Sequence, residues 1–245
     1  MRYSLNLKQR LSGRHYACAE AIDYTGKKVL NIGCGNGTFE YLAANKAKEI
    51  VGIDIKYEDI LQAKEEYAKF KNVNFVEFNL LEKDLPENSA DVVTMFDVIE
   101  HLPKDSEPEI LKKIYKILKE NGQIVISTPL ENFTKYLDLA WYFGHRHYTK
   151  EQLVELLVDA GFEVEKIYTR GGIYEMLSML LFYPFKWILN LEIPVKRWWD
   201  EKRKKEYEVD NGYNTLFIIA RKNRSHAVRS FRSEPWDPLV SRRDY

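Results

Sequence analysis

The chain has 245 residues, of which 45% are hydrophobic and 30% charged, a composition typical of a soluble globular protein and a length sufficient for one full α/β domain. Basic and acidic residues number 37 each, so the formal net charge is zero and nucleic acid is disfavoured as an overall electrostatic partner. The chain has only two cysteines, Cys18 and Cys34, without metal-type spacing, and so small a number suits a reducing, cytoplasmic compartment and no disulfide framework.

The two ends of the chain fall outside the regular pattern. Residues 1–27 precede any predicted strand, and RHYACAEAID predicts a helix over 14–23. The opening MRYSLNLKQRL holds no apolar run, so no secretory signal is expected. The arginine-rich end, 223–245, lacks periodicity and is expected to form a tail outside the fold. We therefore expect a single domain over 1–222.

From residue 27 onward, apolar runs of strand length alternate with amphipathic segments. The apolar runs predict strands over 27–33, 49–55, 73–78, 90–99, 122–128, 162–169 and 213–222. The amphipathic segments predict helices over 38–47, 57–70, 107–122 and 149–162, the third closed by Asn121-Gly122 and the last opened by Thr149 and stopped at Gly161. This order is typical of an α/β fold with a doubly wound, seven-stranded, mostly parallel sheet.

The stretch VLNIGCGNGTFEY, residues 29–41, places Gly33, Gly35 and Gly37 directly after the first predicted strand. In a doubly wound sheet, ligands bind outside the carboxyl ends of the strands, where this loop must lie. A dinucleotide fingerprint has glycine at positions one, three and six, whereas the third glycine here is at position five. No Gly-Lys-Ser/Thr follows, so a P-loop is not indicated.

Two polar residues end the next predicted strands. Asp54 closes the second strand, where a carboxylate can accept hydrogen bonds from both hydroxyls of a ribose. Asn79 closes the third, where its oxygen can accept from an adenine amino group. With the glycine loop, these residues favour one adenosine bearing a short polar tail over a dinucleotide. Taken singly, each feature also has a purely structural interpretation: the glycines can form a tight turn, and a polar residue at a strand end can cap it.

Four stretches, in this order along the chain, resemble the successive motifs of class I S-adenosylmethionine-dependent methyltransferases: VLNIGCGNGTFEYL, VGIDI, FNLLEKDLPENSADVVTMFDVIEHLP and NGQIVISTP. The resemblance runs from about residue 12 to residue 222. FDVIEHL and GHRHYTKEQLVELLVDAGFEVE are most similar to the small-molecule branch that includes the quinone-biosynthesis O-methyltransferases. The resemblance implies a Rossmann-like sheet with an antiparallel last strand, S-adenosyl-L-methionine as cofactor and S-adenosyl-L-homocysteine as product.

The resemblance also implies which residues bind the cofactor. The glycine loop would line its methionine part, with Asp54 at the ribose and Ile55 beside the adenine. Residues after the third and fourth strands would meet the adenine edge and lie under the cofactor, and the N-terminal GRHY is similar to a segment that covers the cofactor carboxylate. The full set is Gly33, Cys34, Gly35, Gly37, Asp54, Ile55, Asn79, Leu80, Phe96, Asp97, Arg14 and Tyr16.

This chain departs from the family pattern at two of these places. The family often has an acid where the chain has Asn31, and an aspartate where it has Asn79. Asparagine keeps an acceptor oxygen but loses the charge, so we expect cofactor binding to survive, weakened at the cofactor ammonium.

His101, in VIEHL after the fourth strand, is the candidate general base, because imidazole titrates in the useful range. Glu100 could orient this base or ligate a divalent ion, as in some relatives. His145 and His147, in GHRHYT, could reach the acceptor or join Glu100 at a metal. The alternative for Glu100, His101, His145 and His147 is a structural role, in which they cap loops and a helix. No metal site is assigned.

Residues 171–212 separate the last two predicted strands and form a long helical insert. Charged residues and a proline interrupt its apolar part, so no membrane span is predicted. Three interpretations are kept for it: a lid over the acceptor, a peripheral membrane contact through 173–200, and a dimer interface. The oligomeric state is accordingly a monomer or a homodimer.

The leading hypothesis is methyl transfer to a small-molecule acceptor, with a hydroxyl favoured and a lipophilic molecule compatible with the insert. The first alternative is an NAD-dependent oxidoreductase, against which the glycine spacing argues. The second is a non-catalytic adenosyl-binding scaffold. A nucleic-acid methyltransferase is disfavoured because the chain lacks an Asn/Asp-Pro-Pro-Tyr/Phe motif and a net basic charge.

Overall fold

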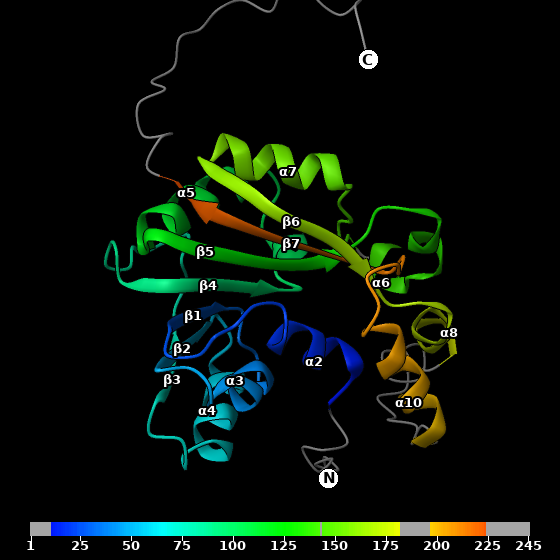
Figure 1. Ribbon diagram of the computed structural model, residues 1–245, viewed down its shortest axis with the longest axis horizontal. Coiled ribbons are helices and arrows are strands. Elements are labelled where there is room, and N and C mark those ends of the chain that lie inside the picture. Colours follow the sequence, from blue (N-terminus) through cyan, green and yellow to red (C-terminus); the bar gives the residue numbers. More distant parts are fainter. Residues whose placement is uncertain (1–10, 143, 182–196, 224–245) are drawn as a thin grey trace, which may run out of the picture.

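The computed structural model describes residues 11–142, 144–181 and 197–223, and one seven-stranded sheet forms its centre (Figure 1). The strands are β1 (Lys28–Ile32), β2 (Glu49–Asp54), β3 (Val73–Glu77), β4 (Ala90–Phe96), β5 (Leu118–Pro129), β6 (Phe162–Arg170) and β7 (Thr215–Lys222). They are ordered β3-β2-β1-β4-β5-β7-β6, and only β7 runs antiparallel to its neighbours. This confirms the predicted fold class, including the antiparallel last strand.

Helices cover both faces of the sheet. On one face lie α2 (Gly13–Ala19), α3 (Thr38–Ala43) and α4 (Tyr57–Glu66), and on the other lie α5 (Glu107–Ile117) and α7 (Lys150–Asp159) (Figure 1). Each face has its own buried apolar cluster, the first including Phe39 and Ile60 and the second Ile114 and Leu157. The central strand β4 is buried along most of its length, which is why its sequence is an almost unbroken apolar run.

The third predicted helix ends earlier than its sequence suggests. α5 stops at Ile117, and Leu118 already has an extended ψ of 136° and pairs with Ala90 of β4. The predicted closure at Asn121-Gly122 is therefore wrong, because these two residues lie within β5. Asn121 adopts a left-handed φ of 61° there. Pairing with the sheet outweighs the helix propensity of the intervening residues.

The fourth predicted helix begins and ends where the sequence indicates. Thr149 caps α7 by accepting a hydrogen bond from Gln152 N at 3.2 Å, and the Gln152 side chain accepts from Thr149 N at 3.0 Å. This reciprocal pair is a capping box. After the helix, Gly161 has a φ of 96°, which a residue with a side chain rarely adopts.

In the described part of the insert between β6 and β7, two helices lie side by side, α8 (Ile173–Leu181) and α10 (Arg197–Glu206). The Glu206 carboxylate accepts from Gly172 N, Tyr174 N and Glu175 N at 3.1, 2.8 and 3.0 Å, and so caps the start of α8 from another helix. Arg203 pairs with the buried Glu175 at 2.7 Å. The rest of the predicted insert, 182–196, and the predicted tail beyond residue 223 lie outside the described residues.

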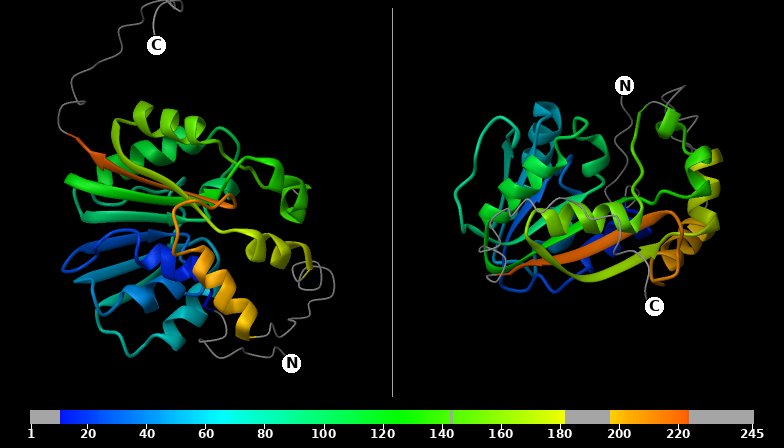
Figure 2. Two further views of the ribbon diagram at one scale, coloured as in Figure 1. Left: turned by 45° about the vertical axis from the view of Figure 1, so that its right-hand side comes forward. Right: turned by 90° about the horizontal axis from the view of Figure 1, so that it is seen from above.

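Three short elements complete the carboxyl edge of the sheet: η1 (Ile99–His101), η2 (Phe133–Leu137) and α6 (Leu139–Tyr142). With α8 and α10 they lie beyond the carboxyl ends of β4 and β5, and α10 also packs against α2 (Figure 2). Within the described ranges, no helix has the length and apolar character needed to cross a membrane.

Candidate cofactor and active site

The loops after β1, β2 and β4 meet at one edge of the sheet because these strands are parallel neighbours. The amides of Gly33 and Cys34 both donate to the carbonyl of Ile53, at 2.8 and 3.0 Å, and tie the glycine loop to the end of β2. The amide of Asp97, after β4, donates to the Ser127 carbonyl at 2.9 Å. The predicted site residues on these loops are thereby brought to a common edge.

The three glycines of the loop all have left-handed φ values, but their surroundings differ. A Cβ on Gly33 would lie 2.3 Å from Val98 Cγ2, and one on Gly37 would lie 2.7 Å from both Phe75 and Tyr67. A Cβ on Gly35 would meet no heavy atom within 4 Å. Packing within the protein therefore accounts for Gly33 and Gly37, and Gly35 is the position that presents bare backbone to open space.

Asp54 binds the loop as well as ending β2. Its Oδ2 accepts from Gly35 N at 2.8 Å and its Oδ1 from Lys56 N at 3.0 Å. A carboxylate oxygen has two lone pairs, so each oxygen retains capacity to accept a ligand hydroxyl. Ile55, the next residue, is 67% exposed, which gives this strand end an apolar surface beside the carboxylate.

Asn79 and Leu80 follow β3, where Asn79 is half-buried and Leu80 is buried. Asn79 Oδ1 accepts from Leu81 N at 3.1 Å and its Nδ2 donates to Glu82 Oε1 at 2.8 Å, so the amide shapes a local turn. The Leu80 side chain is buried, and its carbonyl accepts from the Lys113 ammonium at 3.0 Å. Contact of these two residues with an adenine edge stays a prediction.

Asp97 and Arg14 join the N-terminal helix to the end of β4. The Arg14 guanidinium lies 3.0 Å from Asp97 Oδ2, and Ser127 Oγ donates to Asp97 Oδ1 at 3.3 Å. Phe96 instead packs inward on Phe39, with 5.1 Å between ring centroids. Tyr16 lies under the Lys204 ammonium, 4.5 Å from its ring centroid, and so contacts α10. Of the GRHY segment, Arg14 is the residue shown to reach the sheet edge.

A buried polar network beneath the glycine loop was not predicted from sequence. Asn31 Nδ2 donates to Glu40 Oε1 at 2.7 Å, and Thr94 Oγ1 donates to Asn31 Oδ1 at 2.8 Å. Both Asn31 and Glu40 are buried, so the asparagine that departs from the family faces this network. Burial raises the pKa of Glu40 to about 7. The sequence signal that could have indicated this contact is the position of Glu40, nine residues after Asn31 and across the turn from β1 to α3.

The Cys34 side chain also points into the protein. A Cβ on Gly52 would lie 2.9 Å from Cys34 Cβ and 2.6 Å from Glu40 Oε1, so Gly52 makes room for both side chains. Burial, with a smaller effect of Glu40, raises the pKa of the Cys34 thiol. Cys34 therefore presents its backbone to the site and keeps a protonated thiol inside.

Glu100 and His101 lie on the 3₁₀ turn η1. Glu100 is buried and accepts from Thr128 Oγ1 at 3.1 Å, and burial followed by the nearby Asp97 raises its pKa well above the usual range. His101 is exposed, and its ring lies perpendicular to that of His145 with 4.2 Å between centroids. Partial burial and His145 lower the pKa of His101, so its imidazole is neutral at neutral pH.

The two histidines of GHRHYT have different surroundings. His145 faces His101, whereas the side chain of His147 is buried between Asp138 Oδ2 at 3.2 Å and the Leu130 carbonyl at 3.3 Å. Among residues 11–142, 144–181 and 197–223, no three His, Cys, Asp or Glu side chains are grouped as metal ligands. The predicted alternative of a metal shared by Glu100 with these histidines is not assembled there.

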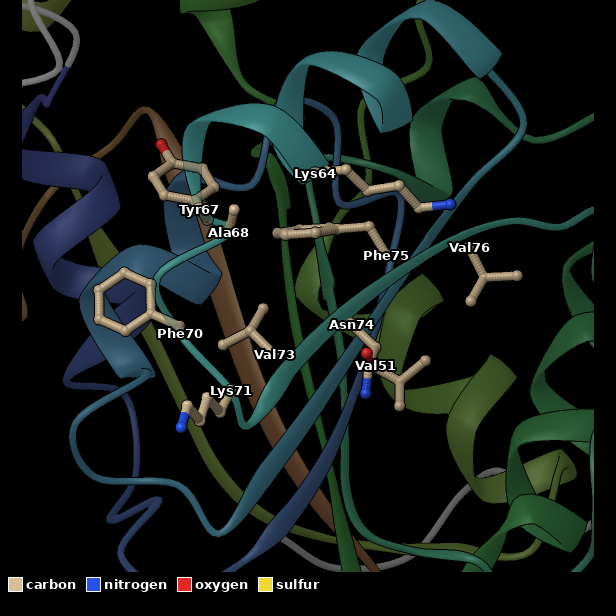
Figure 3. Close-up of a pocket in the computed structure, with 10 residues that line it drawn as sticks. All are labelled: Val51, Lys64, Tyr67, Ala68, Phe70, Lys71, Val73, Asn74, Phe75 and Val76. Atoms are coloured by element: carbon tan, nitrogen blue, oxygen red, sulfur yellow. The ribbon is translucent and has the colours of Figure 1, made fainter.

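A cavity of about 700 Å³ lies between α4 and β3, the strand at one lateral edge of the sheet (Figure 3). None of the predicted site residues lines it. Its lining residues are Val51, Lys64, Tyr67, Ala68, Phe70, Lys71, Val73, Asn74, Phe75 and Val76. Two of its lining residues, Tyr67 and Phe75, also pack under Gly37 of the glycine loop.

A family model described as a methyltransferase domain matches residues 6–167. The chain belongs to this family and, as the sequence resemblance predicts, to the class I S-adenosylmethionine-dependent methyltransferases.

Two relatives illustrate the match. A probable S-adenosylmethionine-dependent methyltransferase of Mycolicibacterium smegmatis is 34% identical over 142 residues, covering 57% of this chain and 53% of that protein. A ubiquinone biosynthesis O-methyltransferase of Neisseria meningitidis is 34% identical over 174 residues, covering 64% of this chain and 71% of that protein. The chain thus spans about half the length of the first relative.

Solved structures share the fold at low identity. The [4+2]-cyclase SpnF aligns with a TM-score of 0.63 at 20% identity, over 90% of this chain and 86% of that one. A phosphoethanolamine N-methyltransferase 2 of Haemonchus contortus, in complex with phosphomonomethylethanolamine and S-adenosylhomocysteine, aligns with a TM-score of 0.61 at 20% identity, over 86% and 52%. Their names cover different reactions, so the fold alone does not identify the acceptor.

Proposed function

We propose that the chain transfers a methyl group from S-adenosylmethionine to a hydroxyl group of a small molecule. The observation that carries the proposal is the junction of Gly35, Asp54 and Ile55, which combines open backbone, a carboxylate with acceptor capacity and an exposed apolar side chain. These match the polar tail, the ribose hydroxyls and the base of an adenosyl group. The ion pair of Arg14 and Asp97 would hold the carboxylate and ammonium of the amino-acid end.

The cofactor, when bound, supplies a methyl group activated for in-line displacement by a nucleophile. The chain has then to hold the acceptor in line and to receive its proton. Positioning of this kind can lower a barrier by roughly 7–11 kcal/mol. His101 is the proposed base, because a neutral imidazole at neutral pH can accept the proton of a hydroxyl.

Calorimetric titration of the protein with S-adenosylhomocysteine and with NAD tests the cofactor. Binding of S-adenosylhomocysteine without binding of NAD supports the proposal, and binding of NAD alone would favour the oxidoreductase. Transfer of labelled methyl to a panel of phenols and of primary amines then tests the acceptor. Binding without transfer to any of them would favour the scaffold alternative.

His101→Ala tests the base. Turnover at saturating acceptor is expected to fall by about 10²–10⁴-fold, as for loss of a general base. Turnover close to that of the unaltered protein across pH 6 to 9 would remove His101 from this role.

We further propose that the acceptor is lipophilic and that the insert contacts an anionic lipid surface. Large apolar side chains are exposed on η2, α6, α8 and α10, at one end of the molecule: Phe133, Tyr136, Tyr142, Ile173, Leu180, Leu181 and Trp198. On α10, Lys202 and Lys205 follow Trp198 by four and seven residues, so the three side chains share a helix face. Adjacent aromatic and basic residues are typical of interfacial helices.

Flotation with vesicles containing phosphatidylglycerol tests this contact. Trp198→Ser with Lys202→Gln and Lys205→Gln should reduce the floated fraction. Val158→Ser, a change of an exposed apolar side chain on α7, is the matched control. Equal flotation of the two variants would contradict the contact.

A further inference from the structure

One arginine, Arg146, bonds to both ends of the 3₁₀ turn that carries His101. Arg146 Nη2 donates to the Ile99 carbonyl at 3.0 Å and to the Leu102 carbonyl at 2.7 Å, which lie on the two sides of Glu100 and His101. Its Nη1 forms an ion pair with the buried carboxylate of Glu107, at the start of α5. The guanidinium therefore joins both ends of the turn to the first residue of the following helix.

Tyr148 strengthens the same connection. Its hydroxyl lies 3.2 Å from the Ile99 carbonyl and 2.9 Å from Glu107 Oε1, and the Arg146 guanidinium lies 5.7 Å from its ring centroid. The Tyr148 backbone is anchored to the end of β5, where its amide donates to the Pro129 carbonyl at 3.2 Å. The turn is thus fixed to the sheet through a neighbouring segment.

The turn has little internal support. The amide of His101 donates to the Val98 carbonyl at 2.9 Å, and that of Leu102 to the Ile99 carbonyl at a long 3.4 Å. A three-residue 3₁₀ turn with such bonds does not fix its own side-chain directions. The direction of the His101 ring therefore depends on contacts from outside the turn. These are the bond from Thr128 to Glu100, the donors from Arg146 and Tyr148, and the perpendicular contact with His145.

We propose that Arg146 is a positioning residue, which holds the turn η1 so that the His101 ring stays against His145 and faces the acceptor. This rests on the proposed function, in which His101 receives the acceptor proton. Arginine is required because its planar guanidinium can donate to two carbonyls and a carboxylate at once. Lysine has a single ammonium at the end of a flexible chain and cannot reproduce this fork.

The proposal assigns a function to three residues of GHRHYT: His145, Arg146 and Tyr148. Arg146 and Tyr148 hold the backbone of the turn, and His145 contacts the ring that the turn carries. The groups that act on His101 electrostatically are His145 and Lys56, which favour its neutral form, and Asp97, which favours its charged form.

The test is an NMR titration of the histidine rings in the unliganded protein, combined with kinetics. In Arg146→Lys the contact between the rings of His101 and His145 should weaken, and the midpoint of the His101 titration should move up toward its ordinary value. Turnover should fall by about tenfold to a hundredfold while the KM for S-adenosylmethionine changes by less than about twofold. Tyr148→Phe should shift both readouts in the same direction by a smaller amount, and it replaces Arg146→Lys should that variant not fold.

Arg221→Lys is the matched control. Arg221 pairs with Glu165 and donates to the Asn121 carbonyl at 3.2 Å, on the strand β7 and away from the site. Its change should leave the His101 titration and turnover as they are. If Arg146→Lys and Tyr148→Phe also leave the two rings in contact and the titration unmoved, the positioning role is overturned. Failure of the proposed base is separate, since it would appear as full turnover in His101→Ala.

Discussion

The carboxylate of Asp54 accepts a hydrogen bond from the backbone amide of Gly35, with 2.8 Å between nitrogen and oxygen. This bond joins the end of β2 to the loop after β1. The proposed ribose acceptor and the loop that would contact the amino-acid tail are therefore built as one unit. A change on either side of the bond should disturb recognition of both parts of the cofactor.

Asp54→Asn should weaken binding of S-adenosylhomocysteine by roughly tenfold to a hundredfold, because hydrogen bonds to a charged group contribute about 1.5–3 kcal/mol. The new amide would also present donors to Gly35 N or Lys56 N, which are donors themselves. Calorimetric titration measures the change. Asp91→Asn is the control, since Asp91 accepts from Lys28 N at 2.8 Å at the opposite end of the sheet. Equal affinities in the two variants would contradict the assignment of Asp54.

Gly35→Ala should lower cofactor affinity more than it lowers stability. Gly35 and Gly26 both have left-handed φ values, 49° and 72°, and a Cβ on either would meet no atom within 4 Å. Each alanine should therefore cost about 1–2 kcal/mol of unfolding free energy from backbone strain. Only Gly35→Ala should reduce binding of S-adenosylhomocysteine. Gly33→Ala should destabilise further, because its Cβ would meet Val98 Cγ2 at 2.3 Å.

Glu40 should make the protein less stable as pH rises from about 4.5 to about 7. Burial raises its folded-state pKa from 4.5 to about 7, so in this window the unfolded chain ionises the carboxyl and the folded chain does not. The loss is absent below pH 4.5 and complete above pH 7. Glu40→Gln has no such titration and still accepts from Asn31, so it should regain up to about 3 kcal/mol at pH 8.

Urea unfolding of Glu40→Gln and the unaltered protein at pH 5 and pH 8 measures this difference. Glu77→Gln, which changes an exposed carboxyl on β3, serves as the control. A stability difference between Glu40→Gln and the unaltered protein that is the same at both pH values would refute the interpretation.

Glu206→Gln should loosen α8 while leaving the sheet intact. The carboxylate accepts from three backbone amides at the start of α8, and the amide oxygen of glutamine can replace only part of this. Loss of such a cap costs about 0.5–2 kcal/mol, which should appear as faster hydrogen exchange over 173–181. Glu208→Gln, at an exposed position just beyond α10, should leave exchange in α8 unchanged. Faster exchange spread over β4 and β5 would point to global destabilisation instead.

The features that sequence predicted well are those fixed by neighbours along the chain. Thr149 opens the fourth helix as predicted, and the structure shows it in a capping box with Gln152, three residues further on. The glycine loop and Asp54 follow apolar runs directly, so their place at the carboxyl edge could be predicted from the order of the elements.

The features that sequence did not predict depend on partners far along the chain. Arg146 binds the turn at Ile99, and Glu206 caps a helix that begins more than thirty residues earlier. No local pattern marks either residue. The early end of α5 has the same origin, because Leu118 pairs with Ala90 of another strand. Helix propensity is a property of neighbouring residues, so it does not indicate when strand pairing with a distant segment will end a helix.

The position of β7 bears on how the chain is completed during synthesis. β7 lies between β5 and β6, and β6 has β7 as its strand neighbour at that edge of the sheet. A ribosome delivers β6 some fifty residues before the strand it must pair with, and domains assemble as units once their chain is available. β6 therefore waits for almost the entire described chain to emerge. A nascent chain stalled before Thr215 would contain β6 but not β7, so β6 would have no strand to pair with.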